Sequence, residues 1–191
     1  MKVLAIAGSP RPHSNTDYLV EQALEEINKY GIETEKVLLR KYKIHGCVGH
    51  DECGTFQSCT FKDDGAWILN RLVEADGVIL ATPVYYFNVT AQLKAFIDRN
   101  YFLYKHNQKS KAKSVGLIVV AGGEGIEDTV NTLQKYIAES FDVPNDRLLV
   151  LTGYAGGKDT IKDKPLLVEE ARRMGRKMAE TLNSLQNSPP K

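Results

Sequence analysis

The chain has 191 residues, of which 42% are hydrophobic and 26% charged, and these values are typical of a soluble globular protein. A formal net charge of +1 argues against a nucleic-acid-binding surface, and weakly against a pure electron shuttle, which usually carries a strong field of one sign. No apolar run is long enough for a membrane span, and a strand begins directly after Met1, leaving no room for a signal peptide. We therefore expect a cytoplasmic protein with no nucleic-acid or membrane partner.

Strand-like and helix-like segments alternate along the chain. Apolar runs rich in β-branched residues predict strands, and apolar residues at helical spacing predict helices. Strands are expected at 2–8, 33–39, 77–82, 114–121 and 147–153, and helices at 16–30, 64–73, 90–102, 126–141 and 165–186. A polar, cysteine-bearing insertion lies at 40–63, a basic loop lies at 104–113, and the tail 187–191 is expected to fray.

This alternation predicts one α/β domain over residues 1–191, with a parallel sheet covered by helices on both faces. In such sheets a ligand binds at the carboxyl ends of the strands, where the strand order switches. The loops after the first, third and fourth strands are therefore the candidate binding loops.

The first candidate loop is SPRPHSNT (9–16), which separates a strand from the start of a helix. The unpaired N–H groups of a helix N-terminus favour an anion. Side-chain donors are supplied by Ser9, Arg11, Ser14, Asn15 and Thr16. The spacing fits neither a P-loop nor a dinucleotide fingerprint. Two interpretations remain: a phosphate site, or a helix cap in which Ser14 and Asp17 form a capping box.

The second candidate loop places three aromatic residues directly after a buried strand. Its residues are Pro83, Val84, Tyr85, Tyr86, Phe87 and Asn88. A phosphate site beside an aromatic wall suits a planar heteroaromatic phosphate, whose ring edge the backbone N–H groups of 84–88 can meet. The alternative is that these aromatics pack on a neighbouring helix or a second subunit. In the third loop, Gly122 and Gly123 leave room for a flat ligand, although the glycines taken alone favour an ordinary strand-to-helix turn.

Two long motifs carry a resemblance to a known family. AGSPRPHSNT (7–16) and TPVYYFNVTAQLKAFIDR (82–99) resemble the flavodoxin-like NAD(P)H-dependent FMN reductases and iron–sulfur flavoproteins. The resemblance implies a three-layer α/β/α fold, with a five-stranded parallel sheet of order 2-1-3-4-5, and non-covalent FMN. It places the phosphate on the donors of 9–16 and the flavin ring on 83–88, with Gly122 and Gly123 near its other edge. It also implies a homodimer or homotetramer, in which Lys94, Asp98 and Arg99 lie on a helix that supports subunit packing.

The insertion contains the chain's three cysteines, Cys47, Cys53 and Cys59, and an odd number in so short a segment is unlike a disulfide framework. In iron–sulfur flavoproteins an insertion at this place resembles a four-cysteine pattern that binds a 4Fe–4S cluster. Laid on that pattern, Cys47, Cys53 and Cys59 match the first, third and fourth ligands, and His50 falls on the second. Three readings stay open: a cluster with one imidazole ligand, a zinc site, or three thiols without metal.

The leading hypothesis is an FMN-dependent oxidoreductase. It would pass electrons from NAD(P)H or a reduced carrier protein to a quinone, a flavin or another acceptor, with an iron–sulfur cluster as a candidate relay. The flavin carries the chemistry, so no acid–base residue is expected to be catalytic. The alternatives are a non-enzymatic carrier of the flavodoxin type and a cysteine-based redox sensor on the same scaffold.

Overall fold

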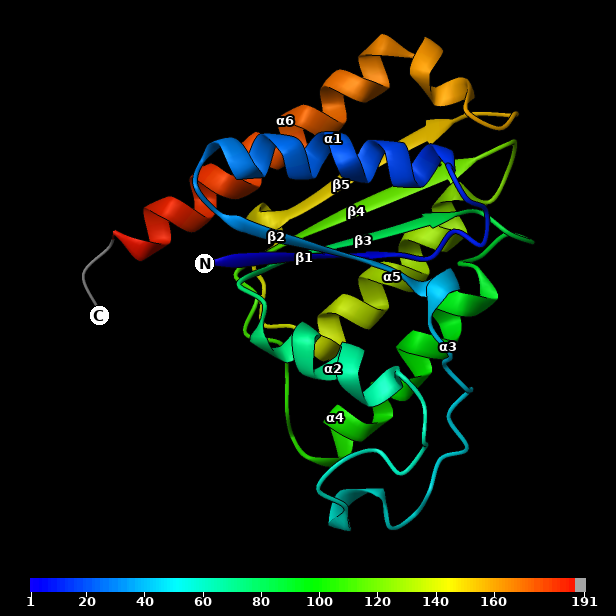
Figure 1. The fold of residues 1–191 in the computed structure, drawn as a ribbon, viewed down its shortest axis with the longest axis vertical. Coiled ribbons are helices and arrows are strands. Elements are labelled where there is room, and N and C mark those ends of the chain that lie inside the picture. Colours follow the sequence, from blue (N-terminus) through cyan, green and yellow to red (C-terminus); the bar gives the residue numbers. More distant parts are fainter. Residues whose placement is uncertain (188–191) are drawn as a thin grey trace.

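The computed structural model describes residues 1–187, so the expected fraying of the tail falls mainly on 188–191, outside the described residues. Its centre is a parallel sheet of order β2-β1-β3-β4-β5 (Figure 1). The strands are β1 (Lys2–Ala7), β2 (Glu33–Leu38), β3 (Gly77–Pro83), β4 (Ser114–Ala121) and β5 (Leu148–Tyr154). The helices are α1 (Asn15–Lys29), α2 (Gly65–Glu74), α3 (Ala91–Arg99), α4 (Tyr101–Lys105), α5 (Ile126–Ser140) and α6 (Pro165–Gln186). The predicted fold class and strand order are confirmed.

Helices cover the sheet on both faces. In Figure 1, α1 and α6 lie on one face and α2, α3, α4 and α5 on the other. The inner strands are buried throughout, and their side chains enter one of two hydrophobic clusters according to the face toward which they point. Burial on both faces explains why the strands are continuous apolar runs rather than alternating ones.

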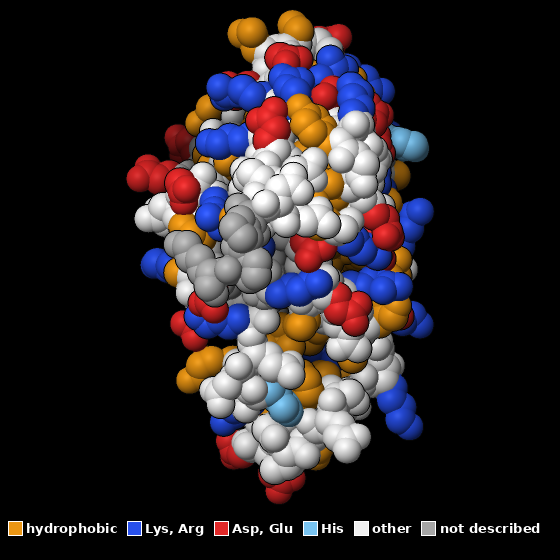
Figure 2. All heavy atoms as spheres, turned by 90° about the vertical axis from the view of Figure 1, so that its left-hand side faces the viewer, with side chains coloured by type: hydrophobic (Ala, Val, Ile, Leu, Met, Phe, Trp, Pro, Cys, Tyr) orange, Lys and Arg blue, Asp and Glu red, His pale blue; other side chains and the backbone are white. Residues whose placement is uncertain are grey.

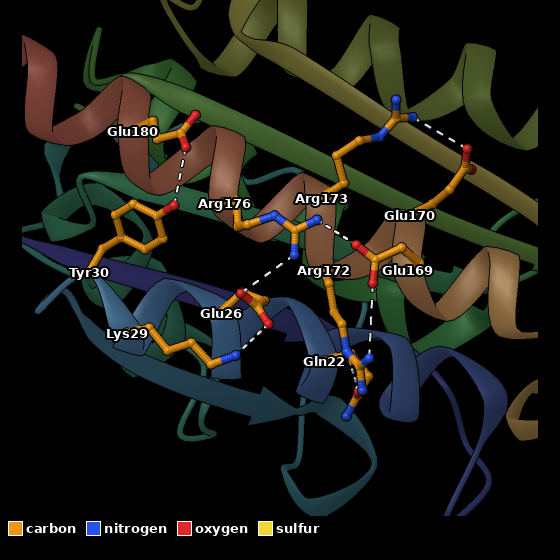
Figure 3. Close-up of polar contacts among 10 residues, drawn as sticks. All are labelled: Gln22, Glu26, Lys29, Tyr30, Glu169, Glu170, Arg172, Arg173, Arg176 and Glu180. Atoms are coloured by element: carbon orange, nitrogen blue, oxygen red, sulfur yellow. Dashed lines mark hydrogen bonds and ion pairs between the residues drawn. The ribbon is translucent and has the colours of Figure 1, made fainter.

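The pair α1 and α6 packs closely because α6 has a glycine at the contact. A Cβ on Gly175 would clash with the backbone carbonyl of Ala23. Polar contacts then join the rims of the two helices, as Figure 3 shows: the Arg172 guanidinium donates to Gln22 Oε1, and the Tyr30 hydroxyl donates to Glu180. These contacts fix the first helix, and with it the loop that precedes it.

The helix expected over 90–102 is broken into α3 and α4 at Asn100. The Asn100 side chain donates to the Phe96 carbonyl at 2.9 Å and accepts from the Tyr136 hydroxyl at 3.0 Å. Burial of the asparagine amide between two helices therefore outweighs the continuous helical pattern of the sequence.

Charge is mixed over the surface. Figure 2 shows the face at the amino ends of the strands, where lysine and arginine side chains are interspersed with acidic ones. The cysteine-bearing insertion forms an extended excursion beside α4, at the bottom of Figure 1. Within residues 1–187, no helix is long and apolar enough to cross a bilayer.

Candidate cofactor site

A cavity of about 230 Å³ lies at the carboxyl ends of the strands, where the strand order switches. Nine of the residues predicted to bind the cofactor line it: Ser9, Arg11, Ser14, Asn15, Thr16, Pro83, Val84, Tyr85 and Gly122. Tyr86, Phe87, Asn88 and Gly123 do not. The cavity is smaller than the roughly 300–1,000 Å³ typical of enclosed small-molecule sites.

The loop 9–16 is both a helix cap and a cluster of phosphate-type donors. Ser14 is the N-cap of α1, and its Oγ accepts from the Asp17 backbone N–H at 3.2 Å. The same Oγ lies 3.0 Å from Thr16 Oγ1, and the Arg11 backbone N–H donates to Ser9 Oγ at 3.3 Å. Ser14 therefore caps α1, but the capping box is not closed, because Asp17 Oδ2 pairs with Arg40 and Asp17 Oδ1 has no partner among the described residues. The cap leaves the Arg11 guanidinium exposed at the cavity.

Gly8 lets this loop pack against the start of α3. Its N–H donates to the Ala81 carbonyl at 2.7 Å, and its own carbonyl accepts from the Thr90 hydroxyl at 2.6 Å. A Cβ at this position would lie 2.8 Å from Leu93 Cβ, inside van der Waals contact. The end of the first strand is thus fixed to the helix that follows the third strand.

Asn15 has a different role from the predicted side-chain donor to phosphate. Its Nδ2 donates to the Gly157 carbonyl at 2.8 Å, and its Oδ1 accepts from the Ile161 backbone N–H at 3.2 Å. The side chain therefore fastens the loop between β5 and α6 to the N-terminus of α1. Sequence reasoning missed that loop, although the pair of glycines followed by Lys158 is a visible signal.

The missed loop brings a second cation to the cavity. Gly156, Gly157 and Lys158 line the cavity, together with Ala155. The ammonium of Lys158 and the guanidinium of Arg11 therefore border the same cavity, which favours an anionic group such as a phosphate.

The aromatic loop forms a tight turn with unusual backbone angles. Tyr85 and Asn88 exchange two backbone hydrogen bonds of 2.9 and 3.1 Å. Between them Tyr86 and Phe87 have φ of 51° and 63°, as in a type I′ turn, where glycine and asparagine are normally found. The Tyr86 side chain is 98% exposed, so it points to solvent rather than forming a cavity wall.

This turn also corrects the expected set of N–H donors to a flavin ring. The N–H of Val84 donates to the Val120 carbonyl at 2.8 Å, and those of Tyr85 and Asn88 are used within the turn. Among residues 84–88 of the described chain, the backbone N–H groups of Tyr86 and Phe87 have no protein acceptor.

Arg99 anchors the cysteine-bearing insertion rather than a subunit surface. The side chain is only 1% exposed, and its guanidinium donates to Asp63 Oδ2 at 2.7 Å and to Cys59 Sγ at 3.0 Å. Burial alone would raise the pKa of Asp63, but hydrogen bonds from Arg99 and from the backbone N–H groups of His45 and Gly65 lower it well below its usual range. The predicted packing role of Lys94 and Asp98 is not tested, and the two form an exposed ion pair.

The four predicted metal ligands are not brought together. In the part of the chain that the structure describes, no group of three or more His, Cys, Asp or Glu side chains could hold a metal ion. Cys59 is hydrogen-bonded to Arg99, and the His50 ring packs against Phe56. Burial, and then the nearby thiols of Cys59 and Cys47, raise the pKa of Cys53. In this arrangement the described residues therefore form no ready-made metal site.

The strand order, with a cavity at the switch point, places the chain in the class of flavodoxin-like α/β proteins. The chain belongs to the NADPH-dependent FMN reductase family, whose model matches residues 1–151. It is 36% identical to an iron–sulfur flavoprotein of Archaeoglobus fulgidus, over 100% of this chain and 84% of that protein. It is 35% identical to an iron–sulfur flavoprotein of Methanocaldococcus jannaschii, over 95% and 97% of the two chains.

Solved structures agree on the fold. A crystal structure of RosB matches with a TM-score of 0.77 at 22% identity, covering 100% of this chain and 82% of that one. A flavodoxin from the domain Archaea matches with a TM-score of 0.61 at 15% identity, over 96% and 99% of the two chains. Membership of the family identifies the protein as an FMN-dependent oxidoreductase.

Proposed function

We propose that this protein uses FMN in the cavity to pass electrons from NAD(P)H or a reduced carrier protein to a quinone, a flavin or another acceptor. The observation that supports this most directly is that Arg11 and Lys158 line the same cavity as Tyr85 of the aromatic loop. Bound FMN supplies the electron-accepting chemistry. We further propose a single cytoplasmic FMN-binding domain that assembles into a homodimer or homotetramer.

Each part of the cavity has a task in this proposal. Arg11, Lys158 and the free helix N–H groups hold the phosphate, while Tyr85 and Gly122 bound the space for the ring. The backbone N–H groups of Tyr86 and Phe87 have no acceptor among the described residues, so they are available to hydrogen-bond a ligand. Because the cavity is too small to enclose the whole cofactor, the ring edge stays accessible to a donor and an acceptor.

The phosphate assignment is tested with Arg11→Ala combined with Ser14→Ala. We expect loss of FMN while the far-UV circular dichroism spectrum is retained, because removal of an N-cap costs only about 1 kcal/mol. Arg173→Ala is the matched control, since Arg173 is an exposed arginine on α6 that pairs with Glu170 away from the cavity. Unchanged FMN occupancy in the double variant would remove loop 9–16 from the phosphate site.

The electron donor is tested by mixing the FMN-loaded protein with NADH or NADPH without oxygen and following flavin bleaching. Direct bleaching, followed by turnover with a quinone, is expected of the proposed reductase. Bleaching only after addition of a separate reductase would instead favour the carrier function.

Iron–sulfur binding is a separate hypothesis, supported by the names of the relatives and by the spacing of the cysteines. It is tested by iron and acid-labile sulfide analysis of protein purified without oxygen, with His50→Ala measured beside it. Iron and sulfide in the wild-type protein and a loss in His50→Ala would support ligation by the cysteines and His50. Flavin without iron or sulfide would contradict it.

A further inference from the structure

A second cavity adjoins the proposed phosphate site. It has a volume of about 260 Å³ and shares Ser14 with the cofactor cavity. Three segments form its walls: the start of α1 with the residue before it, the end of β2 with the residues that follow, and the loop between β5 and α6. The two cavities are therefore neighbours on the phosphate side of the site, away from the aromatic loop.

The second cavity combines cations with an aromatic ring. Lys41 and Lys162 line it with exposed ammonium groups, and the latter lies 5.6 Å from the centre of the Tyr18 ring. Arg40 also lines it, but its guanidinium is engaged with Asp17 Oδ2 at 2.7 Å. Carboxylates line the cavity too: Glu21 pairs with Lys36, and Asp159 has no ion pair among the described residues. Lys41 and Lys162 are the lining cations without an ion pair among the described residues, and the Tyr18 ring is available to a flat group if the exposed lysine beside it moves away.

Asp17 supplies an independent sign of a missing ligand. Its side chain is only 6% exposed, and its Oδ1 atom is buried without a hydrogen-bond partner among the described residues. Leaving a buried acceptor without a hydrogen bond destabilises the folded protein, so this atom calls for a donor. The residue lines the second cavity, so a hydroxyl group bound there could supply that donor.

We propose that the second cavity binds the adenylate half of flavin adenine dinucleotide, so that the site accepts FAD as well as FMN. This inference rests on the proposed phosphate site at loop 9–16. FAD continues from the FMN phosphate into a second phosphate, a ribose and an adenine. Lys162 offers a cation to the second phosphate, and Asp17 offers a hydrogen-bond acceptor to the ribose hydroxyls. The Tyr18 ring offers an aromatic face to the adenine.

Competing ligands fit this cavity less well. A bare metal cation does not suit it, because the described residues there form no metal-binding group. A free phosphate would leave the Tyr18 ring and Asp17 Oδ1 unused. The adenylate uses all three features, and its link to the flavin half fixes it beside Ser14.

The experiment compares FMN and FAD binding to apoprotein by quenching of flavin fluorescence, in the wild type and in Lys162→Ala. We expect FAD to bind the wild type at least as tightly as FMN. Removal of one exposed cation should weaken FAD binding about threefold to fivefold and leave FMN binding unchanged. The matched control is Lys164→Ala, which removes an exposed lysine of the same segment that lines neither cavity.

Each outcome decides the inference. FAD weaker than FMN by more than tenfold would show that the adenylate is excluded. FAD and FMN weakened equally by Lys162→Ala, or both unchanged, would show that the adenylate does not contact Lys162, and either result overturns the assignment. Binding of neither flavin to the wild type would instead overturn the proposed function.

Discussion

The strained turn at Tyr86 leads to a prediction opposite to the usual effect of mutation: Tyr86→Asn should stabilise the protein. At φ of 51°, Tyr86 adopts the left-handed backbone conformation, which destabilises most non-glycine residues by about 1–2 kcal/mol. Asparagine tolerates this region better. The Tyr86 side chain is 98% exposed, so its removal sacrifices almost no burial. We therefore expect the free energy of unfolding to rise by about 1 kcal/mol and the Tm by roughly 2–4 °C.

The measurement is urea and thermal unfolding of apoprotein, because bound FMN would add its own stabilisation. Tyr104→Asn is the control: this tyrosine is also exposed but lies in α4, where asparagine brings no relief of backbone strain. A fall in the Tm of Tyr86→Asn, or an equal gain in Tyr104→Asn, would refute the strain argument. Strain of this kind tends to persist at functional sites, so we also expect the variant to lose turnover.

Three other perturbations test how the structure holds its site. Arg99→Ala should lower the free energy of unfolding by about 3–5 kcal/mol, because it leaves the buried Asp63 carboxylate unpaired. Proteolysis within 40–63 should also accelerate. The control Asp98→Ala, in an exposed ion pair, should change the free energy of unfolding by less than about 1 kcal/mol. Since Asp63 has a lowered folded-state pKa, its stabilisation is present above its unfolded pKa of about 4 and is lost as the pH falls further. Acid unfolding of Asp63→Asn should therefore be less pH-dependent, and an unchanged profile would contradict this. Gly8→Ala should lower the Tm and weaken FMN binding, because the new Cβ would clash with α3. An unaltered Tm and unaltered FMN binding would show that the loop can shift.

The sequence by itself determined the layered fold and the location of the site. Alternating strand and helix patterns are local signals, and a parallel sheet leaves few topologies for them. The loops at the carboxyl ends were therefore identifiable before any contact was known. Ser14 as the cap of α1 followed from its position relative to Asp17, since a capping interaction spans only one helical turn.

Only the tertiary structure decided which atoms are free to act. Asn15 bonds to a loop more than a hundred residues later in the chain, and Lys158 enters the cavity from that loop. Arg99 belongs to a family motif, yet its burial against Asp63 and Cys59 depends on the path of the insertion. A side chain's partners are set by where distant segments meet, and burial then decides whether a polar atom is already paired or still needs a ligand. Neither the partners of a side chain nor the pairing of its polar atoms can be predicted from residue type and spacing alone.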